Sequence, residues 1–415
     1  MKKTSRKTGS YQGLFRLFAS ITLAAFLLVT GPFVTGAKAE KFKIGGVVCF
    51  TGAFAQLGIG MRNGVELAIK DNGGKILDRE VEFMWADSEM KAMVGVEKTK
   101  KFIADGADLI YGAVSSGTTR AVSEVCLANK KLHLVTISTL PEITRKGHRY
   151  IFRTSPHQES EDIQAAEAFN AKKDLESVYI FCHDYQVARD SAGRAAKWIK
   201  EAGKKVYGPD PFPLTQTDFS VYIHKVIESK VDAVGLWATG AANVNFIKQA
   251  AQFGLHKKVW IFGPVLVDSN DVLALKKIGL GMETSVRYSW NYDVPANKVF
   301  VDKFKKEYGR LPTAWEGEAY DGMSWFIKVA EETGSMDVEK WVDAFEGSVY
   351  KDSLKGTKTM RKCDHQAMQV GLWARDVKQD KAPKYYLKVV KVFPPDKIYE
   401  PCPKNSADWP SKRAK

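Results

Sequence analysis

Two hydroxyl-rich turns are the part of this chain best suited to bind a small anion. Residues 112–119 read Gly-Ala-Val-Ser-Ser-Gly-Thr-Thr after one apolar run, and residues 136–141 read Thr-Ile-Ser-Thr-Leu-Pro after the next. A strand that enters a helix through such a turn presents hydroxyls and free backbone N–H groups to a carboxylate. Serine and threonine also favour helix N-caps without any ligand, but two such turns on successive strands favour a binding site.

Other strand ends offer walls for such a site. The turn at residues 50–58 adds apolar side chains, with Phe54 and Leu57 among them, and the amide of Gln56. In the second half of the chain, Tyr185 and Trp237 follow apolar runs. Each of these two aromatic residues is suited either to stack on a ligand or to pack in a core.

Enzyme motifs are weak in this sequence. Gly58 and Gly60 with a later Asp87 resemble a dinucleotide-binding pattern, but Asn63 stands where the third glycine belongs. The sequence has no phosphate-binding loop that ends in Gly-Lys-Ser/Thr and no Gly-x-Ser-x-Gly elbow. His183 and Asp184 are neighbours on a predicted strand and point to opposite faces, so they do not cooperate directly. We expect a binding protein without a cofactor and not an enzyme.

The five cysteines leave at least one unpaired. Cys49 and Cys182 lie in apolar runs and Cys126 on a helical pattern, whereas Cys363 and Cys402 lie among polar and proline-rich neighbours near the C-terminus. Cys363 with Cys402 is therefore the favoured disulfide in an exported chain. No Cys-x-x-Cys pair or histidine cluster is present, so no metal site is expected.

The first 39 residues have the pattern of an export signal. Basic residues precede an apolar run at 17–29 that is too short to span a bilayer comfortably, and Ala37 and Ala39 suit a cleavage site. A membrane anchor is the alternative, but Pro32 interrupts the apolar stretch and favours cleavage. We expect the mature chain to begin at about Glu40 and to be soluble outside the cytoplasm.

The net charge does not indicate a nucleic-acid partner. The formal charge is +14, but six basic residues and no acidic ones lie within residues 1–39, which leaves 56 basic against 48 acidic residues, or +8, in the remainder. Most of this excess is dispersed along the chain, which is typical of a solvated surface. A mild preference for anionic ligands is consistent with it.

Hydrophobic periodicity predicts the fold. Short apolar runs rich in Val, Ile and Leu alternate with amphipathic stretches, first at residues 43–49, 81–87, 108–114 and 132–138. The rhythm repeats at residues 178–182, 205–207, 233–237 and 259–262. This alternation predicts an α/β protein with two doubly wound lobes, each a parallel sheet covered by helices on both faces.

After residue 286 the pattern becomes helical, and strand-like runs return at 369–374 and 385–392. This late segment is too short for a third α/β domain, so we expect it to complete both lobes through hinge crossovers. The predicted division is a signal peptide over 1–39, a first lobe of 40–154 plus about 287–348, a second lobe of 155–286 plus about 349–400, and a tail of 401–415. Ligands of open α/β sheets bind beyond the carboxyl ends of the strands, which predicts a cleft between the lobes.

The chain resembles the substrate-binding proteins of ABC uptake systems, in the branched-chain amino-acid-binding (Leu/Ile/Val-binding-like) group with the type I periplasmic binding fold. The similarity covers nearly all of the chain after residue 39. The matching segments are residues 43–45, 51–52, 60–68, 112–119, 141–144, 150–154, 217–220, 249–250 and 254–255. The resemblance implies a protein that captures a small molecule between two lobes and delivers it to a permease in the inner membrane.

The resemblance also assigns contacts. The family's carboxylate-binding serine falls on Ser116, with Ser115 beside it. Its backbone-carbonyl and threonine contacts fall on Ile137 and Thr139, with Ser138 between them. Its side-wall residue falls near Leu57. In the second lobe the aromatic lid position falls on Ala188, a departure for which Tyr185 is the expected substitute, and a further contact falls near Thr239 beside Trp237.

The most informative departure is Val265. Amino-acid binders of this group place an acidic residue there to hold the ammonium of the ligand, and a buried ammonium without a carboxylate costs several kcal/mol. Asp268 or Glu316 are the alternatives for that role. We therefore predict a ligand with a carboxylate or an amide and no α-ammonium, and aromatic ligands suit Trp237, Tyr185 and Phe54.

The predicted function is an extracytoplasmic solute-binding protein of an ABC importer. Two alternatives remain at this point: an ordinary branched-chain amino-acid binder, and a sensor of the same fold that presents its ligand to a membrane receptor. We expect a monomer with a small-molecule ligand, an ABC permease as its partner and no nucleic acid.

Overall fold

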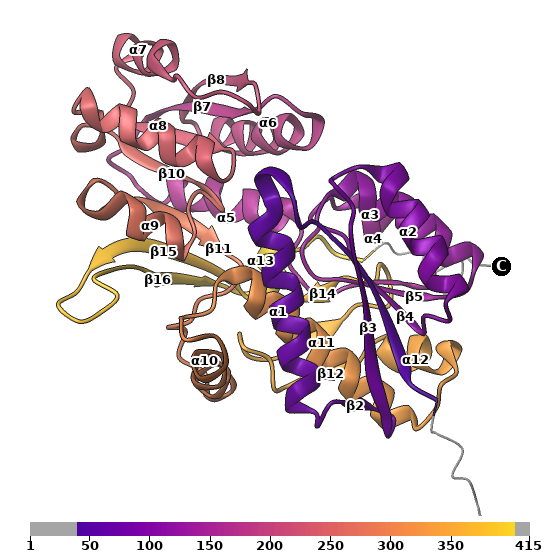
Figure 1. Cartoon of the computed structure of the whole chain (residues 1–415). Coiled ribbons are helices and arrows are strands. Elements are labelled where there is room, and N and C mark those ends of the chain that lie inside the picture. The colour runs from indigo at the N-terminus through magenta and orange to yellow at the C-terminus, as the bar shows by residue number, and fades with distance from the viewer. Residues whose placement is uncertain (1–39, 403–415) are drawn as a thin grey trace, which may run out of the picture. The chain divides into compact units, whose positions relative to one another are not determined.

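Two β-sheets, each with its own helices, organise the chain (Figure 1). The computed structural model describes residues 40–402. The expected signal peptide over 1–39 and the tail beyond residue 402 lie outside the described residues. Within the described range, no helix has both the length and the apolar character needed to cross a bilayer.

The first sheet has six strands in the order β2-β3-β1-β4-β5-β6. All neighbours pair in parallel except β2 and β3, which form a tight antiparallel hairpin. The strands are β1 Phe42–Val48, β2 Lys75–Ile76, β3 Arg79–Asp87, β4 Leu109–Gly112, β5 Leu132–Val135 and β6 Ile151–Arg153. The four strands predicted for this lobe are confirmed as β1, β3, β4 and β5; β1, β4 and β5 are largely buried on both faces, whereas β3 is only partly buried.

Helices cover both faces of this sheet. One face packs against α2 and α3 through Val47, Phe102, Ile110 and Val122. The other packs against α1 and the late helices α11 and α12 in the largest core cluster of the described chain. The helices of this part are α1 Ala55–Asp71, α2 Ala92–Ala104, α3 Ser116–Ala128, α4 Glu142–Arg145, α10 Pro295–Tyr308, α11 Ala314–Thr333 and α12 Val338–Phe345, with the short 3-10 turn η1 Gly52–Phe54.

Close contact between α1 and α11 depends on a glycine. A Cβ on Gly64 would lie 2.5 Å from the carbonyl oxygen of Glu316. Only a residue without a side chain lets the two helix backbones approach this closely. The contact fixes the late segment, with Glu316, onto the first lobe.

The second sheet has seven strands in the order β16-β15-β11-β10-β9-β7-β8. Its central strands are parallel as predicted, but β15 is antiparallel to both β11 and β16. A short hairpin joins β15 to β16. The strands are β7 Ser177–His183, β8 Lys205–Phe212, β9 Ala233–Trp237, β10 Trp260–Pro264, β11 Glu283–Val286, β15 Gly371–Lys378 and β16 Tyr385–Phe393.

This sheet is also covered on both faces. Residues of α7, α8 and α9 form one apolar cluster with it, and residues of α5, α6 and α13 form the other. The elements are α5 Gln158–Asn170, α6 Gln186–Glu201, α7 Ser220–Ser229, α8 Ala241–Gln252, α9 Ser269–Leu275 and α13 Pro395–Ile398, with 3-10 turns η2 Leu255–Lys257 and η3 Lys276–Ile278. Both lobes therefore have the predicted doubly wound α/β architecture.

The chain passes between the two sheets three times, after β6, after β11 and before β15. A small antiparallel sheet of β12 Val349–Tyr350, β13 Lys358–Met360 and β14 Ala367–Met368 precedes the last passage. Tyr350, Met360 and Ala367 belong to the core cluster of the first lobe, although the sequence assigned residues 349–368 to the second. The lobe boundaries stay a prediction, and these contacts favour a boundary next to β15.

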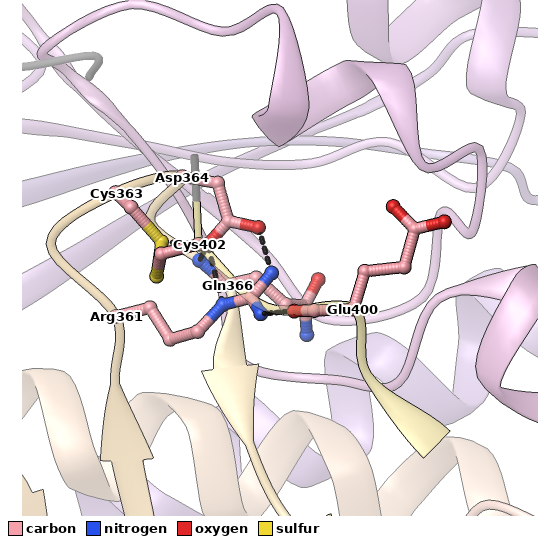
Figure 2. Close-up of a disulfide and its surroundings, with 6 residues drawn as sticks. All are labelled: Arg361, Cys363, Asp364, Gln366, Glu400 and Cys402. Atoms are coloured by element: carbon pink, nitrogen blue, oxygen red, sulfur yellow. Dashed lines mark hydrogen bonds and ion pairs between the residues drawn. A yellow bond between two sulfur atoms is a disulfide. The ribbon is translucent and has the colours of Figure 1, made fainter. Parts of the chain in front are cut away.

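Cys363 and Cys402 form a disulfide with a Cα–Cα distance of 5.7 Å (Figure 2). Arg361 pairs with Asp364 beside it and donates to the carbonyl of Glu400 at 2.5 Å. The bridge therefore joins the segment that follows α13 to the turn between β13 and β14. The other three cysteines are free and buried.

Candidate ligand-binding site

The two hydroxyl-rich turns lie side by side. They follow the paired strands β4 and β5, in which Tyr111 lies beside Leu134. Ser138 Oγ donates to Ser116 Oγ at 3.1 Å, and the backbone N–H of Leu140 donates to the same oxygen at 3.3 Å. Ser116 is thus fixed at the junction of the two turns and remains partly exposed.

Ser116 opens α3, and Ser115 is its N-cap residue in extended conformation. The side chain of Ser115 makes no capping hydrogen bond. The first backbone N–H groups of a helix carry partial positive charge and have no intrahelical acceptor. The arrangement suits an anionic group of a ligand.

The turn after β5 is held by two buried arginines. Arg153 donates to the carbonyls of Leu140 at 2.7 Å and Ser138 at 3.4 Å. Arg287 donates to the carbonyl of Ile137 at 3.0 Å. Because charged donors fasten three of its carbonyls, this turn is rigid at the place where the sequence predicts ligand contacts.

Thr139 connects this turn to the second lobe. Its carbonyl accepts from the backbone N–H of Gln158 at 2.9 Å, and its hydroxyl lies 3.5 Å from Gln158 Oε1. Gln158 in turn donates to Asp162 at 3.2 Å on α5. Thr139 therefore already has protein partners across the first passage between the sheets.

The loop after β1 forms an apolar wall. Phe54 and Leu57 are partly buried against the first-lobe core, and Gln56 is exposed. Asp87 holds this loop by accepting from Phe50 N at 3.1 Å and Thr51 Oγ1 at 2.7 Å. Burial alone would raise the pKa of Asp87, but the hydrogen bonds from Glu89, Thr51 and Phe50 lower it below the usual value. Asp87 thus has a structural role in the loop.

Tyr185 begins α6 and is 40% exposed. Burial raises the pKa of its hydroxyl, while the charge of Arg287 acts in the opposite direction, so the two groups are within electrostatic reach. The neighbouring His183 is buried, its ring nitrogens have no hydrogen-bond partner among the described residues, and burial lowers its pKa to about 4. Tyr185 is therefore the aromatic residue of this strand end that remains accessible to a ligand.

Trp237 has a different environment. It is only 3% exposed, its ring lies edge-on to Phe262, and its indole N–H donates to Asp162 at 3.1 Å. Asp162 also pairs with Arg194 at 2.7 Å. Of the two roles that the sequence leaves open, the structure favours core packing for Trp237, whereas Thr239 at the same strand end is partly exposed.

Val265 has a left-handed backbone with φ of 48°, and its N–H donates to Ser285 Oγ at 3.1 Å. Its side chain packs against the apolar core cluster of the first lobe. Such a backbone is unusual for a β-branched residue. The position at which amino-acid binders carry an acid therefore presents an apolar contact between the lobes.

The two alternative acids are engaged elsewhere. Asp268 is the N-cap of α9, and its carboxylate accepts from the N–H groups of Asn270 and Asp271. Glu316 completes the N-terminal capping box of α11 by accepting from Thr313 N at 2.8 Å, and it pairs with Arg310 at 2.6 Å. Both carboxylates therefore have local structural partners.

Arg287 and Glu161 are the site residues that the sequence reasoning missed. Arg287 follows β11 and is 8% exposed, and Glu161 on α5 is 1% exposed. Nε and Nη2 of Arg287 donate to the two oxygens of Glu161 at 2.7 and 3.2 Å, and the guanidinium lies 5.5 Å from the ring centre of Trp315. The one sequence signal that could have indicated Arg287 as a site residue is its position directly after an apolar strand.

A buried ion-pair chain continues from Arg287 into the first lobe. Lys355 donates to the backbone carbonyl of Arg287 at 2.5 Å and pairs with Glu318, and Lys358 pairs with Asp321 at 2.5 Å. Burial lowers the pKa of Lys355 to about 8, against the effect of Glu318. Each buried charge in this chain has an opposite neighbour, as buried charges require.

Two α/β lobes whose strand-end turns carry hydroxyls and exposed helix amides define the class of two-lobed solute-binding proteins. The chain belongs to the periplasmic binding protein family, whose sequence model matches residues 41–382. Members of this family are substrate-binding proteins of transport systems and not enzymes. The resemblance and the fold predicted from the sequence are both confirmed.

Three proteins illustrate the range of relatives. The leucine-, isoleucine-, valine-, threonine- and alanine-binding protein of Pseudomonas aeruginosa is 26% identical over 344 residues, which cover 82% of this chain and 90% of that protein. A solute-binding protein of an ABC transporter from Rhodopseudomonas palustris, solved with 3,4-dihydroxybenzoic acid, has a TM-score of 0.79 at 23% identity and covers 86% of this chain and 98% of its own. A leucine-binding protein from Thermotoga maritima has a TM-score of 0.75 at 20% identity and covers 86% and 99%. The two structures establish the shared fold.

Proposed function

We propose that this chain is a periplasmic solute-binding protein of an ABC importer, and that it captures a carboxylate-bearing or amide-bearing ligand without an α-ammonium group. The ligand contacts both lobes, and the closed form is presented to the permease. Hinge closure around a ligand is the motion that such folds use. The export pattern within residues 1–39 supports the periplasmic location.

The environment of Val265 is the observation that carries the ligand class. An ammonium at this position would face an apolar side chain, because Val265 packs against the first-lobe core. Asp268 and Glu316 hold the N-termini of their helices. A buried ammonium without a carboxylate partner is strongly disfavoured, so this site suits ligands that lack one.

Ser116 and the first N–H groups of α3 support the carboxylate end of the proposal. A hydrogen bond to a charged oxygen contributes about 1.5 to 3 kcal/mol. The hydroxyl of Ser116 is held between Ser138 and Leu140, so little side-chain freedom is lost when a ligand binds. Tyr185, Phe54 and Leu57 supply partly exposed apolar surface for the remainder of the ligand.

The relatives bind ligands of both classes. The Rhodopseudomonas protein was solved with an aromatic carboxylic acid that has no amino group, which supports the proposal. The Pseudomonas relative binds branched-chain and other amino acids, so an ordinary amino-acid binder is the second candidate. The two candidate functions differ in whether the site accepts the α-ammonium group of a ligand.

A thermal-shift screen distinguishes them. Benzoate, 4-hydroxybenzoate, 3-phenylpropanoate, short amides, leucine and valine would be added to the purified protein. A ligand that binds only the folded state raises the melting temperature, and the rise grows with the logarithm of its excess over the dissociation constant. We expect stabilisation by carboxylates or amides without an amino group. If leucine or valine stabilised the protein most, the protein would be an ordinary amino-acid binder.

Replacement of Ser116 tests where the carboxylate binds. We expect Ser116→Ala to weaken the best carboxylate by roughly tenfold or more, because a charge-assisted hydrogen bond is removed. Ser229→Ala is the matched control, because this serine at the end of α7 bonds only to the carbonyl of Val226. An unchanged dissociation constant in Ser116→Ala would show that the anionic group lies elsewhere.

A further inference from the structure

We propose that Arg287 determines the charge of the ligand: its guanidinium, fixed at the carbonyl of Ile137, makes the site reject α-ammonium groups and accept carboxylates that lack them. This inference rests on the proposed function and assigns its selectivity to one residue. Arg287 reaches the turn after β5 from the passage that follows β11. It therefore brings a permanent positive charge to the turn that the sequence predicts to contact the ligand.

Arg287 occupies the acceptor that an ammonium would need. The carbonyl of Ile137 accepts from Nη1 of Arg287 at 3.0 Å. A second cation at this carbonyl would lie within contact distance of the guanidinium, in a poorly hydrated place where like charges repel strongly. An α-hydroxyl group of the same size carries no charge and does not meet this repulsion.

Glu161 balances the charge of Arg287, and Glu161, Asp162 and Glu318 all pair with cations of the protein. Both oxygens of Glu161 are engaged by Arg287. Glu318 pairs with Lys355, and Asp162 pairs with Arg194 and accepts from Trp237. These three acids thus already have cationic partners, and an incoming ammonium would have to compete with them.

Arg287 is held in place and is not a mobile surface group. It is 8% exposed, it is paired through two nitrogens with Glu161, and it lies over the ring of Trp315. These contacts use three of its five N–H donors, which leaves one on each terminal nitrogen. A fixed donor of this kind attracts a carboxylate and repels an ammonium without rearrangement.

The test uses ligands that differ at one position only. Two sets would be titrated into the wild-type protein by calorimetry: 3-phenylpropanoate, 2-hydroxy-3-phenylpropanoate and phenylalanine, and then 4-methylpentanoate, 2-hydroxy-4-methylpentanoate and leucine. In the set that binds, we expect the acid and the hydroxy acid to have similar affinities and the amino acid to bind roughly tenfold or more weakly. Rejection of the hydroxy acid together with the amino acid would show a steric cause and overturn the assignment to Arg287.

The variant Arg287→Met with Glu161→Gln removes both charges of the pair, so that no unpaired charge stays buried. We expect its preference for the acid over the amino acid to shrink to within roughly threefold. Arg149→Met is the control, because Arg149 pairs with Glu339 and Asp343 on α12 and has no contact with the turn, and it should keep the wild-type preference.

Each outcome decides the question. If the double variant folds and keeps the full preference for the acid, the role of Arg287 is refuted and the proposed ligand class stands. If the wild-type protein prefers the amino acids, both proposals fail together. If the double variant does not fold, the comparison in the wild-type protein still decides whether charge or size excludes the amino acid, and rejection of the hydroxy acid overturns the proposal.

Discussion

Arg287 and Glu161 form an ion pair that is closed to water on most sides, with 8% and 1% of the two residues exposed. Removing one member would leave the other charged and unpaired, which typically costs 3–5 kcal/mol. Functional tests of this pair therefore need the paired replacement. The same reasoning explains why the buried cations Lys355 and Lys358 each lie beside an acid of α11.

Asp376 is a buried acid without such a partner. It lies on β15, is 1% exposed, and neither carboxylate oxygen has a hydrogen-bond partner among the described residues. Burial raises the pKa of Asp376 to about 7. The folded state therefore favours the protonated form, so the penalty is absent below the ordinary carboxyl pKa, grows as the pH rises from about 4 to 7, and is complete above that range.

We expect Asp376→Asn to raise the free energy of unfolding at about pH 8 by on the order of 2–4 kcal/mol, because the charged form is no longer buried. The gain should shrink towards about pH 4. Urea unfolding of the wild type and the variant across this range measures the difference, and Asp380→Asn on the exposed hairpin is the control. A variant that is less stable than the wild type at pH 8 would show that Asp376 has a partner in solution.

Individual residues show which parts of the site could be predicted from the sequence and which could not. Ser116, Ser138 and Thr139 follow apolar strands, and their proximity follows from the pairing of β4 with β5. The role of Trp237 could not be predicted from the sequence, because its indole N–H donates to Asp162 on a helix 75 positions earlier in the chain. Arg287 was missed for the same reason: its partners Ile137 and Glu161 are 150 and 126 positions away.

At the scale of elements, the strands and most helices were predictable because their signals are local. The runs that predict β7 and β9 are apolar over their whole length, as strands covered on both faces require, whereas the run of β3 contains Glu82 and Asp87 and is only partly buried. The antiparallel direction of β15 could not be predicted from the sequence, because residues 371–378 carry no local signal for which strand pairs with them. The start of α11 could be predicted from the sequence, because Thr313 and Glu316 have the spacing of a capping box. This box gives Glu316 a structural partner without any ligand.

The disulfide ties the last described segment to an earlier turn. Its cysteines are 39 positions apart, and closing a loop of this length in the unfolded chain corresponds to about 3–4 kcal/mol of stabilisation. We expect Cys363→Ser with Cys402→Ser to lower the melting temperature by several degrees, which differential scanning calorimetry would measure.

The reductant response separates the bridge from other effects of the two substitutions. Dithiothreitol should lower the melting temperature of the wild type towards that of the double variant and should leave the variant unchanged. Equal melting temperatures of the oxidised wild type and the double variant would contradict a stabilising disulfide. The free cysteines are buried and should contribute little to the reductant response.

At the scale of the whole molecule, ligand binding and lobe closure are one event in the proposed mechanism. The chain crosses between its sheets three times, and Arg287 lies on one of these passages with contacts to α5 and to the turn after β5. A residue at this place contacts both lobes. In the proposed mechanism, the charge of the ligand is therefore coupled to lobe closure.

In the proposed function, the site binds a carboxylate and excludes an α-ammonium group. The most direct test is a calorimetric titration of the wild-type protein with 3-phenylpropanoate and phenylalanine, and with 4-methylpentanoate and leucine. We expect that in at least one pair the deaminated acid binds one molecule per chain and the amino acid binds roughly tenfold or more weakly. An amino acid that binds as tightly as its deaminated counterpart, or more tightly, would contradict the proposed ligand class.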